Sequence, residues 1–104
     1  MRHYEAMFII DPDTDDETLE AIQAKYTKVV TEAGGEVSEI GKWDRGRRPL
    51  AYEIQQANKK YREGIYLLLQ FVANADVPAE LDRIFRISDD VFRHIIVRQD
   101  EDEE

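Results

Sequence analysis

The chain has no cysteine, only three prolines and five glycines, and no long apolar run. Without cysteine it forms neither a disulfide framework nor a thiolate zinc or iron–sulfur site. Its longest apolar runs, such as Ile65 to Leu69, are far shorter than the roughly 20 residues that span a bilayer. The N-terminus alternates from residue 3 onward, unlike a signal peptide. These absences predict a soluble cytoplasmic protein with no membrane partner.

Acidic residues outnumber basic ones by 23 to 14 among 104 residues, which gives a formal net charge of −9. A chain of this length with 42% hydrophobic residues predicts a single core, which we assign to one domain at residues 1–99. Residues 100–104 are all acidic, and such a block is typical of a disordered tail. The remaining acidity would also suit a salty cytoplasm.

Basic residues concentrate between positions 42 and 62, where only Asp44 and Glu53 are acidic. This segment holds Lys42, Arg45, Arg47, Arg48, Lys59, Lys60 and Arg62. A cationic segment in an acidic protein indicates an anionic partner, and RNA is the leading candidate. The net charge of −9 argues against nonspecific nucleic-acid binding by the whole surface.

Alternation over residues 3–10 predicts a strand with two apolar faces, and therefore a central one. One face holds Tyr4, Ala6, Phe8 and Ile10, and the other holds His3, Glu5, Met7 and Ile9. Thr14 and Glu17 have the spacing of a capping box and predict a helix that begins near Asp15. Its apolar stripe is Leu19, Ile22, Tyr26, Val29, Val30 and Ala33. Gly34 and Gly35 supply a C-terminal stop.

From Glu36 to Ile54 the apolar period is two, which predicts a long strand interrupted by a bulge or bend at Gly41 to Gly46. A polar connection at residues 55–63 leads to a strand at residues 64–72. Asp76-Val77-Pro78 then opens a helix, which ends at residues 88–90 before a last strand at Val91 to Arg98. The buried face of that helix is Val77, Leu81, Ile84 and Phe85.

The order strand, helix, strand, strand, helix, strand predicts an α+β fold of the ferredoxin-like, split βαβ type (βαββαβ). Right-handed crossovers place both helices on one face of a four-stranded antiparallel sheet, so the other face has no cover. We assign Met7, Ile9, Tyr66 and Leu68 to that uncovered face. An apolar patch of this kind favours a protein interface over scattered surface hydrophobics.

No arrangement of residues suggests catalysis, a metal site or a cofactor. Asp11, Asp13 and Asp15 imitate the start of a calcium-binding loop. The sixth position of such a loop is Gly and the twelfth is Glu, whereas this chain has Asp16 and Ile22 there. His3 and His94 are too isolated to suggest a metal site. We therefore predict that the chain is not an enzyme. Base stacking on the open sheet is also disfavoured, because the stretch after Gly64 lacks the signature of RNA-recognition motifs.

The stretch from Gly46 to Ile54 reads Gly-Arg-Arg-Pro-Leu-Ala-Tyr-Glu-Ile. It resembles the Gly-Arg-Arg-x-Leu-Ala-Tyr-x-Ile signature of the bacterial small-subunit ribosomal proteins of the sixth family. Further matches are Met1 to Glu5, Asp11-Pro12, Gly34-Gly35, Trp43 and Asp89 to Arg93, so the resemblance covers residues 1–99. It implies a structural constituent of the small ribosomal subunit without cofactor or small-molecule substrate. It also implies binding to small-subunit (16S) ribosomal RNA in the central domain, as a heterodimer with ribosomal protein eighteen.

The resemblance also implies roles for individual residues. RNA contacts are expected from Arg2, Arg45, Arg47, Arg48, Lys59, Lys60 and Arg93. Contacts with the protein partner are expected from Glu5, Met7, Ile9, Tyr52, Tyr66 and Leu68. Alternatives stay open: Arg47 and Arg48 are adjacent, so one of them could instead pair with an acid. Lys59, Lys60 and Arg62 also suit a solvated loop, and Trp43 and Tyr52 also suit the edge of the core.

Two hypotheses from other classes remain. One is a ferredoxin-like regulatory module that self-associates through its sheet and binds a small anion near the arginines. The other is a small hydrolase, which is disfavoured because the loop at residues 11–17 is acidic and would repel an anionic substrate.

Overall fold

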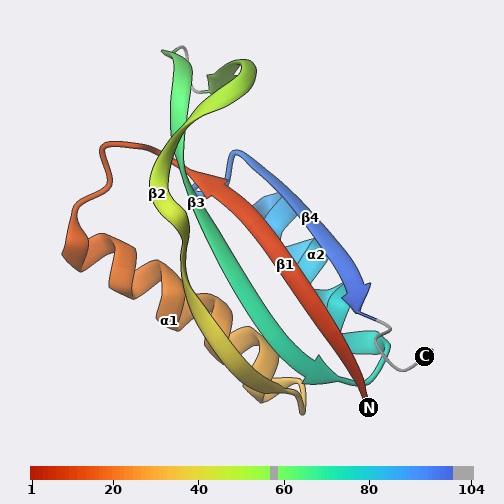
Figure 1. Ribbon diagram of the computed structural model, residues 1–104. Helices are drawn as coiled ribbons and strands as arrows, with labels where there is room; N and C mark the ends of the chain where they lie inside the picture. The colour runs from red at the N-terminus through yellow and green to blue at the C-terminus, as the bar shows by residue number, and fades with distance from the viewer. Residues whose placement is uncertain (57–58, 100–104) are drawn as a thin grey trace.

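A computed structural model describes residues 1–56 and 59–99, with the backbone alone for residues 44–48, 51, 52 and 56 (Figure 1). The elements are β1 (Arg2–Ile10), α1 (Asp16–Glu32), β2 (Glu36–Gln56), β3 (Lys59–Ala73), α2 (Asp76–Ile87) and β4 (Arg93–Gln99). Residues 100–104 lie outside the described residues, so the acidic tail and the domain boundary at residue 99 stay predictions.

The sheet has four strands in the order β2-β3-β1-β4, and every neighbouring pair is antiparallel. Both helices lie on the same face of the sheet, and no helix of the described residues covers the other face (Figure 1). The predicted ferredoxin-like α+β class is confirmed, as is the central position of β1 between β3 and β4.

The main core lies between the sheet and the two helices. The strands contribute the predicted face of β1 and the alternating residues Ile65, Leu67, Leu69 and Phe71 of β3, all buried. The helices contribute Leu19, Ile22, Tyr26 and Val30 from α1 and Val77, Leu81 and Phe85 from α2. Rings from three elements meet at its centre: Phe8 lies 5.3 Å from Tyr26 and 4.9 Å from Phe85, centroid to centroid. These contacts attach both helices to β1.

The start of α1 differs from the predicted capping box. Asp15 is the N-cap, and its Oδ1 accepts a hydrogen bond from the Thr18 backbone N–H at 2.8 Å. Hydrogen bonding from Thr18, through its side chain and its backbone N–H, lowers the pKa of the Asp15 carboxyl. The Thr14 hydroxyl instead donates to the Asp11 carbonyl oxygen at 2.7 Å. The prediction of Thr14 as cap was therefore wrong, because the preceding turn engages its hydroxyl.

At the other end of α1, Gly34 adopts a positive φ of 95°, which confirms the predicted glycine stop. Gly35 is needed for close packing, since a Cβ there would lie 2.8 Å from Val30 Cγ1 and 3.0 Å from Ala73 Cβ. Ala33, predicted to be buried, is exposed because the helix ends at Glu32 and the chain turns away.

The hairpin of β2 and β3 is longer than predicted. β3 begins at Lys59, so residues 59–63, predicted to be a connection, belong to the strand and pair with β2. β2 continues through the expected interruption, but its register shifts there, with residues 43–46 opposite Tyr66 alone. Since Ile10 at the end of β1 pairs with Ile65, the hairpin beyond that point projects past the body of the sheet (Figure 1). We call residues 48–56 and 59–64 the hairpin arm.

β4 begins at Arg93, two positions after the predicted start. Val91 and Phe92 are both buried, whereas consecutive residues in a strand point to opposite faces. The Phe92 backbone N–H donates to the Ile9 carbonyl oxygen at 2.8 Å, which ties the segment to the end of β1. The strand therefore starts only after this buried pair.

Candidate partner and RNA interface

The side of the sheet away from the helices, which we call the open face, carries side chains from three neighbouring strands. Its described members include Glu5, Met7 and Ile9 of β1, Tyr66, Leu68 and Gln70 of β3, and Arg93, Ile95 and Val97 of β4. The register aligns them in rows: Leu68, Met7 and Ile95 lie opposite one another, as do Tyr66, Ile9 and Arg93. The structure thus brings together five of the residues predicted for the protein interface. The sixth, Tyr52, has a side chain outside the described part of the chain.

Sequence reasoning missed two members of this surface, Ile95 and Val97. They are the most exposed apolar residues of the open face, with 59% and 45% of their surface accessible. The sequence contained the signal, because alternation along the last strand puts Ile95 and Val97 on the opposite face of the sheet from His94 and Ile96. Trp43 also lies near this surface, with its ring 6.0 Å from that of Tyr66.

Glu5 lies on the open face, opposite Gln70 of β3 and Val97 of β4. Its Oε2 accepts from Gln70 Nε2 and its Oε1 from Gln99 Nε2, both at 2.9 Å. The carboxylate thereby links β1 to both neighbouring strands. Glu5 therefore organises this part of the open face.

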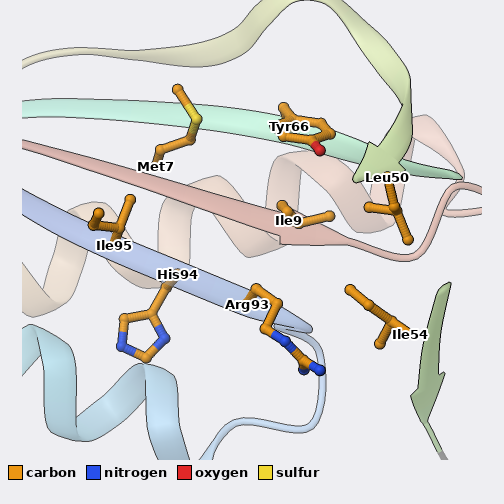
Figure 2. Close-up of a pocket in the computed structure, with 8 residues that line it drawn as sticks. All are labelled: Met7, Ile9, Leu50, Ile54, Tyr66, Arg93, His94 and Ile95. Atoms are coloured by element: carbon orange, nitrogen blue, oxygen red, sulfur yellow. The ribbon is translucent and has the colours of Figure 1, made fainter. Parts of the chain in front are cut away.

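A hollow of about 310 Å³ lies between the open face and the hairpin arm (Figure 2). Its lining is Met7, Ile9, Leu50, Ile54, Tyr66, Arg93, His94 and Ile95. Gly64 allows the arm to curl toward the sheet, since a Cβ there would lie 2.4 Å from Ile9 Cγ2 and 3.3 Å from Leu50 Cδ2. The arm therefore closes one end of the open face.

His94 belongs to the helix side of β4. Its Nε2 lies 2.7 Å from Asp82 Oδ1, and its ring centroid lies 4.9 Å from that of Phe85. The hydrogen bond from His94 lowers the pKa of the Asp82 carboxyl, and Arg86 acts in the same direction. His94 thus joins β4 to α2. Among the residues that the structure describes, no three potential metal ligands cluster together.

The residues predicted to contact RNA fall into separate groups. Lys59 and Lys60 are exposed on the arm, at the same end of the sheet as Arg93, which pairs with Ile9. Arg2 lies at the opposite end of β1, roughly 23 Å away at about 3.3 Å per residue. The side chains of Arg45, Arg47 and Arg48 lie outside the described part, although the backbone pairs Arg47 with Ile65 and Arg48 with Gly64. The structure thus separates Arg2 from the other described candidates.

These features define a class of protein: a ferredoxin-like binding domain with one covered and one open sheet face. No helix in the described ranges, residues 1–56 and 59–99, has the length and apolar character needed to cross a bilayer.

The family follows from comparison with known proteins. Residues 3–98 match the model of the family described as Ribosomal protein S6, and the chain belongs to that family. It is 48% identical over 101 residues to the small ribosomal subunit protein bS6 of Desulforamulus reducens, covering 97% of this chain and 100% of the relative. It is also 48% identical over 99 residues to the bS6 protein of Clostridium beijerinckii, covering 95% and 98%.

A solved structure of 30S ribosomal protein S6 from Thermotoga maritima has the same fold. The TM-score is 0.80 at 30% sequence identity, over 94% of this chain and 87% of the other. The chain is therefore a structural component of the small ribosomal subunit, located in the cytoplasmic ribosome. The predictions of the family and of a non-enzymatic role are confirmed.

Proposed function

We propose that the chain binds 16S ribosomal RNA in the central domain of the small subunit, as a heterodimer with ribosomal protein eighteen. The observation that carries this proposal is the open face, where apolar side chains from β1, β3 and β4 are aligned and neither described helix covers them. Ile95 and Val97 add exposed apolar area at its edge. An uncovered apolar surface of this kind favours a protein partner.

The RNA would be bound by the end of the sheet that carries the arm. Lys59 and Lys60 are exposed there, and Arg93 lies at the same end. Arginine and lysine neutralise phosphate, and the planar arginine fork also holds two phosphate oxygens at once. Arg45, Arg47 and Arg48 of β2 are further proposed RNA contacts, and Arg2 would make a separate contact at the far end of β1.

The net charge of −9 makes cooperation with the partner central to the proposal. Phosphate is repelled by the acidic body, so this chain alone should bind RNA only modestly. A partner seated on the open face would add its own surface beside the arm. The RNA site would thus be shared between two chains.

A gel-shift titration with a 16S central-domain fragment tests the shared site. We expect RNA affinity to rise strongly when ribosomal protein eighteen is added. Equal affinities with and without it would contradict cooperative binding. A stable homodimer of the isolated chain in analytical sedimentation would instead favour the self-associating module.

Replacing Arg47 and Arg48 together by alanine tests the phosphate contacts. Each lost contact should reduce the slope of log affinity against log salt by about 0.7 to 0.9. Arg83→Ala is the control, since Arg83 pairs with Glu80 at 2.8 Å on α2, away from the arm. An unchanged salt slope in the double variant would remove both arginines from the RNA surface.

A further inference from the structure

A small apolar cluster anchors the hairpin arm apart from the main core. Ile54 and Phe92 are only 2% and 8% exposed, yet neither belongs to the main core cluster. Ile54 pairs with Tyr61 across the arm, and the Tyr61 ring centroid lies 4.7 Å from that of Phe92. Phe92 directly precedes β4. The arm therefore packs against the body at the point where β4 begins.

Tyr61 also has a polar contact with the body. Its hydroxyl donates to Asp11 Oδ2 at 3.2 Å, in the loop between β1 and α1. The other carboxylate oxygen of Asp11 accepts from the Asp13 backbone N–H at 2.8 Å, which fixes the acceptor. Desolvation and this hydrogen bond both raise the pKa of Tyr61. One side chain thus joins the arm to two separate segments of the body.

One cation of the arm lies beside this contact: Lys59 Nζ is 5.3 Å from the centroid of the Tyr61 ring. Arg93 follows Phe92, and its Nη1 donates to the Phe92 carbonyl oxygen at 2.7 Å. The aromatic pair of Tyr61 and Phe92 therefore connects Lys59 of the arm with Arg93 of β4.

We propose that Tyr61 is a positioning residue for RNA binding, which holds the arm so that Lys59 and Arg93 form one cationic surface. The proposal rests on the proposed function. Beyond Ile10 and Ile65 the arm pairs only within itself, and an isolated two-stranded hairpin is marginally stable. Its orientation therefore depends on contacts with the body. Without Tyr61 the arm would take the binding orientation only part of the time, and affinity falls in proportion to that fraction.

The test compares Tyr61→Leu, Tyr61→Phe and a charge control in which Lys59 and Lys60 are both methionine. RNA affinity is measured on a 16S central-domain fragment with ribosomal protein eighteen present. We expect Tyr61→Leu to weaken RNA binding about tenfold, which corresponds to an arm that takes the binding orientation about a tenth of the time. Tyr61→Phe keeps the ring contact and should weaken binding only about twofold.

The salt dependence separates positioning from charge. Tyr61→Leu should leave the salt slope unchanged, because the bound complex keeps the same cations. The lysine control should lower the slope. Amide exchange should accelerate within residues 54–62 of Tyr61→Leu and stay slow in β1, and affinity for ribosomal protein eighteen should change less than about twofold.

Three results would overturn the positioning role. The first is wild-type RNA affinity in Tyr61→Leu, in an assay where the unaltered chain binds the fragment. The second is equal loss of RNA and protein affinity with faster exchange throughout the chain, which would mean general unfolding. Phe92→Leu keeps the site apolar and removes the ring contact, so it should reproduce the selective loss of RNA affinity. The third result is wild-type RNA affinity in Phe92→Leu. An unaltered chain that fails to bind RNA would instead overturn the proposed function itself.

Discussion

The two faces of the sheet use alternate residues of the same strands for different purposes. In β1, Phe8 is fully buried beneath both helices, while its neighbours Met7 and Ile9 are half-buried on the open face. The covered face holds the rings that attach the helices, and the open face holds a hollow and exposed apolar side chains. Residues that stabilise the fold and residues proposed to contact the partner are therefore adjacent along the chain. Substitutions on adjacent residues should affect different properties.

The largest effect on stability is expected from Phe8→Ala. Removing a buried ring from the centre of the core should lower the free energy of unfolding by about 3 to 5 kcal/mol. Met7→Ala, the adjacent residue on the open face, should cost less than about 2 kcal/mol. Urea unfolding of both variants measures the difference. Similar losses would show that both faces contribute equally to stability.

Ile95→Asp should have the opposite profile. It places a charge on the open face and should weaken binding to ribosomal protein eighteen by about 30-fold, as at an interface hot spot. Its free energy of unfolding should fall by less than about 1 kcal/mol. Ile87→Asp is a matched control, because Ile87 is 67% exposed at the end of α2, away from the sheet. Calorimetric titration that found equal losses in both variants would argue against the open face as the interface.

A smaller effect on stability is expected at the start of α1, one of the two helices that cover the sheet. Asp15→Ala removes the side-chain cap of α1 and should destabilise the chain by about 1 kcal/mol. Glu17→Ala should cost less than about 0.5 kcal/mol, because Glu17 is not the capping residue. Thermal unfolding of the two variants distinguishes the observed cap from the capping box predicted from sequence. Equal costs would restore the capping box.

The smallest effect concerns the contact between α2 and β4. Asp82 has a lowered pKa in the folded chain, so its contribution to stability is present above the ordinary Asp pKa of about 3.9. That contribution is lost as the pH falls through the lowered folded-state value. Asp82→Asn should therefore cost less than about 1 kcal/mol at neutral pH, and the cost should shrink in acid. The free energy of unfolding is measured from neutral to acid pH, with Asp89→Asn as the exposed control. A loss in Asp82→Asn that did not change with pH would contradict a stabilising role of the Asp82 carboxylate.

The order of the elements and the faces of β1 and β3 could be predicted because alternation is a local signal. Lys59 to Glu63 were interpreted as a connection because charged residues are typical of loops, whereas pairing with β2 makes them a strand. Asp15 and Thr14 are both good caps, and only the fold of the preceding turn decides between them.

The candidate site was predictable in part. The alternating residues Met7, Ile9, Tyr66 and Leu68 were assigned correctly to the open face. The role of Tyr61 could not be predicted, because its contacts join residues 50 and 31 positions away, at Asp11 and Phe92. Such contacts appear only once the arm is placed against the body. The roles of individual residues in RNA and partner binding stay predictions.

The pairing of His3 with Gln99 affects the order in which the strands can pair during synthesis. β1 leaves the translating ribosome first, yet one of its two neighbours in the sheet is the last strand to be synthesised. Contacts between residues so distant in sequence slow folding, because a long loop must close before they form. We therefore expect β1 to pair with β4 only after residues 93–99 have been synthesised.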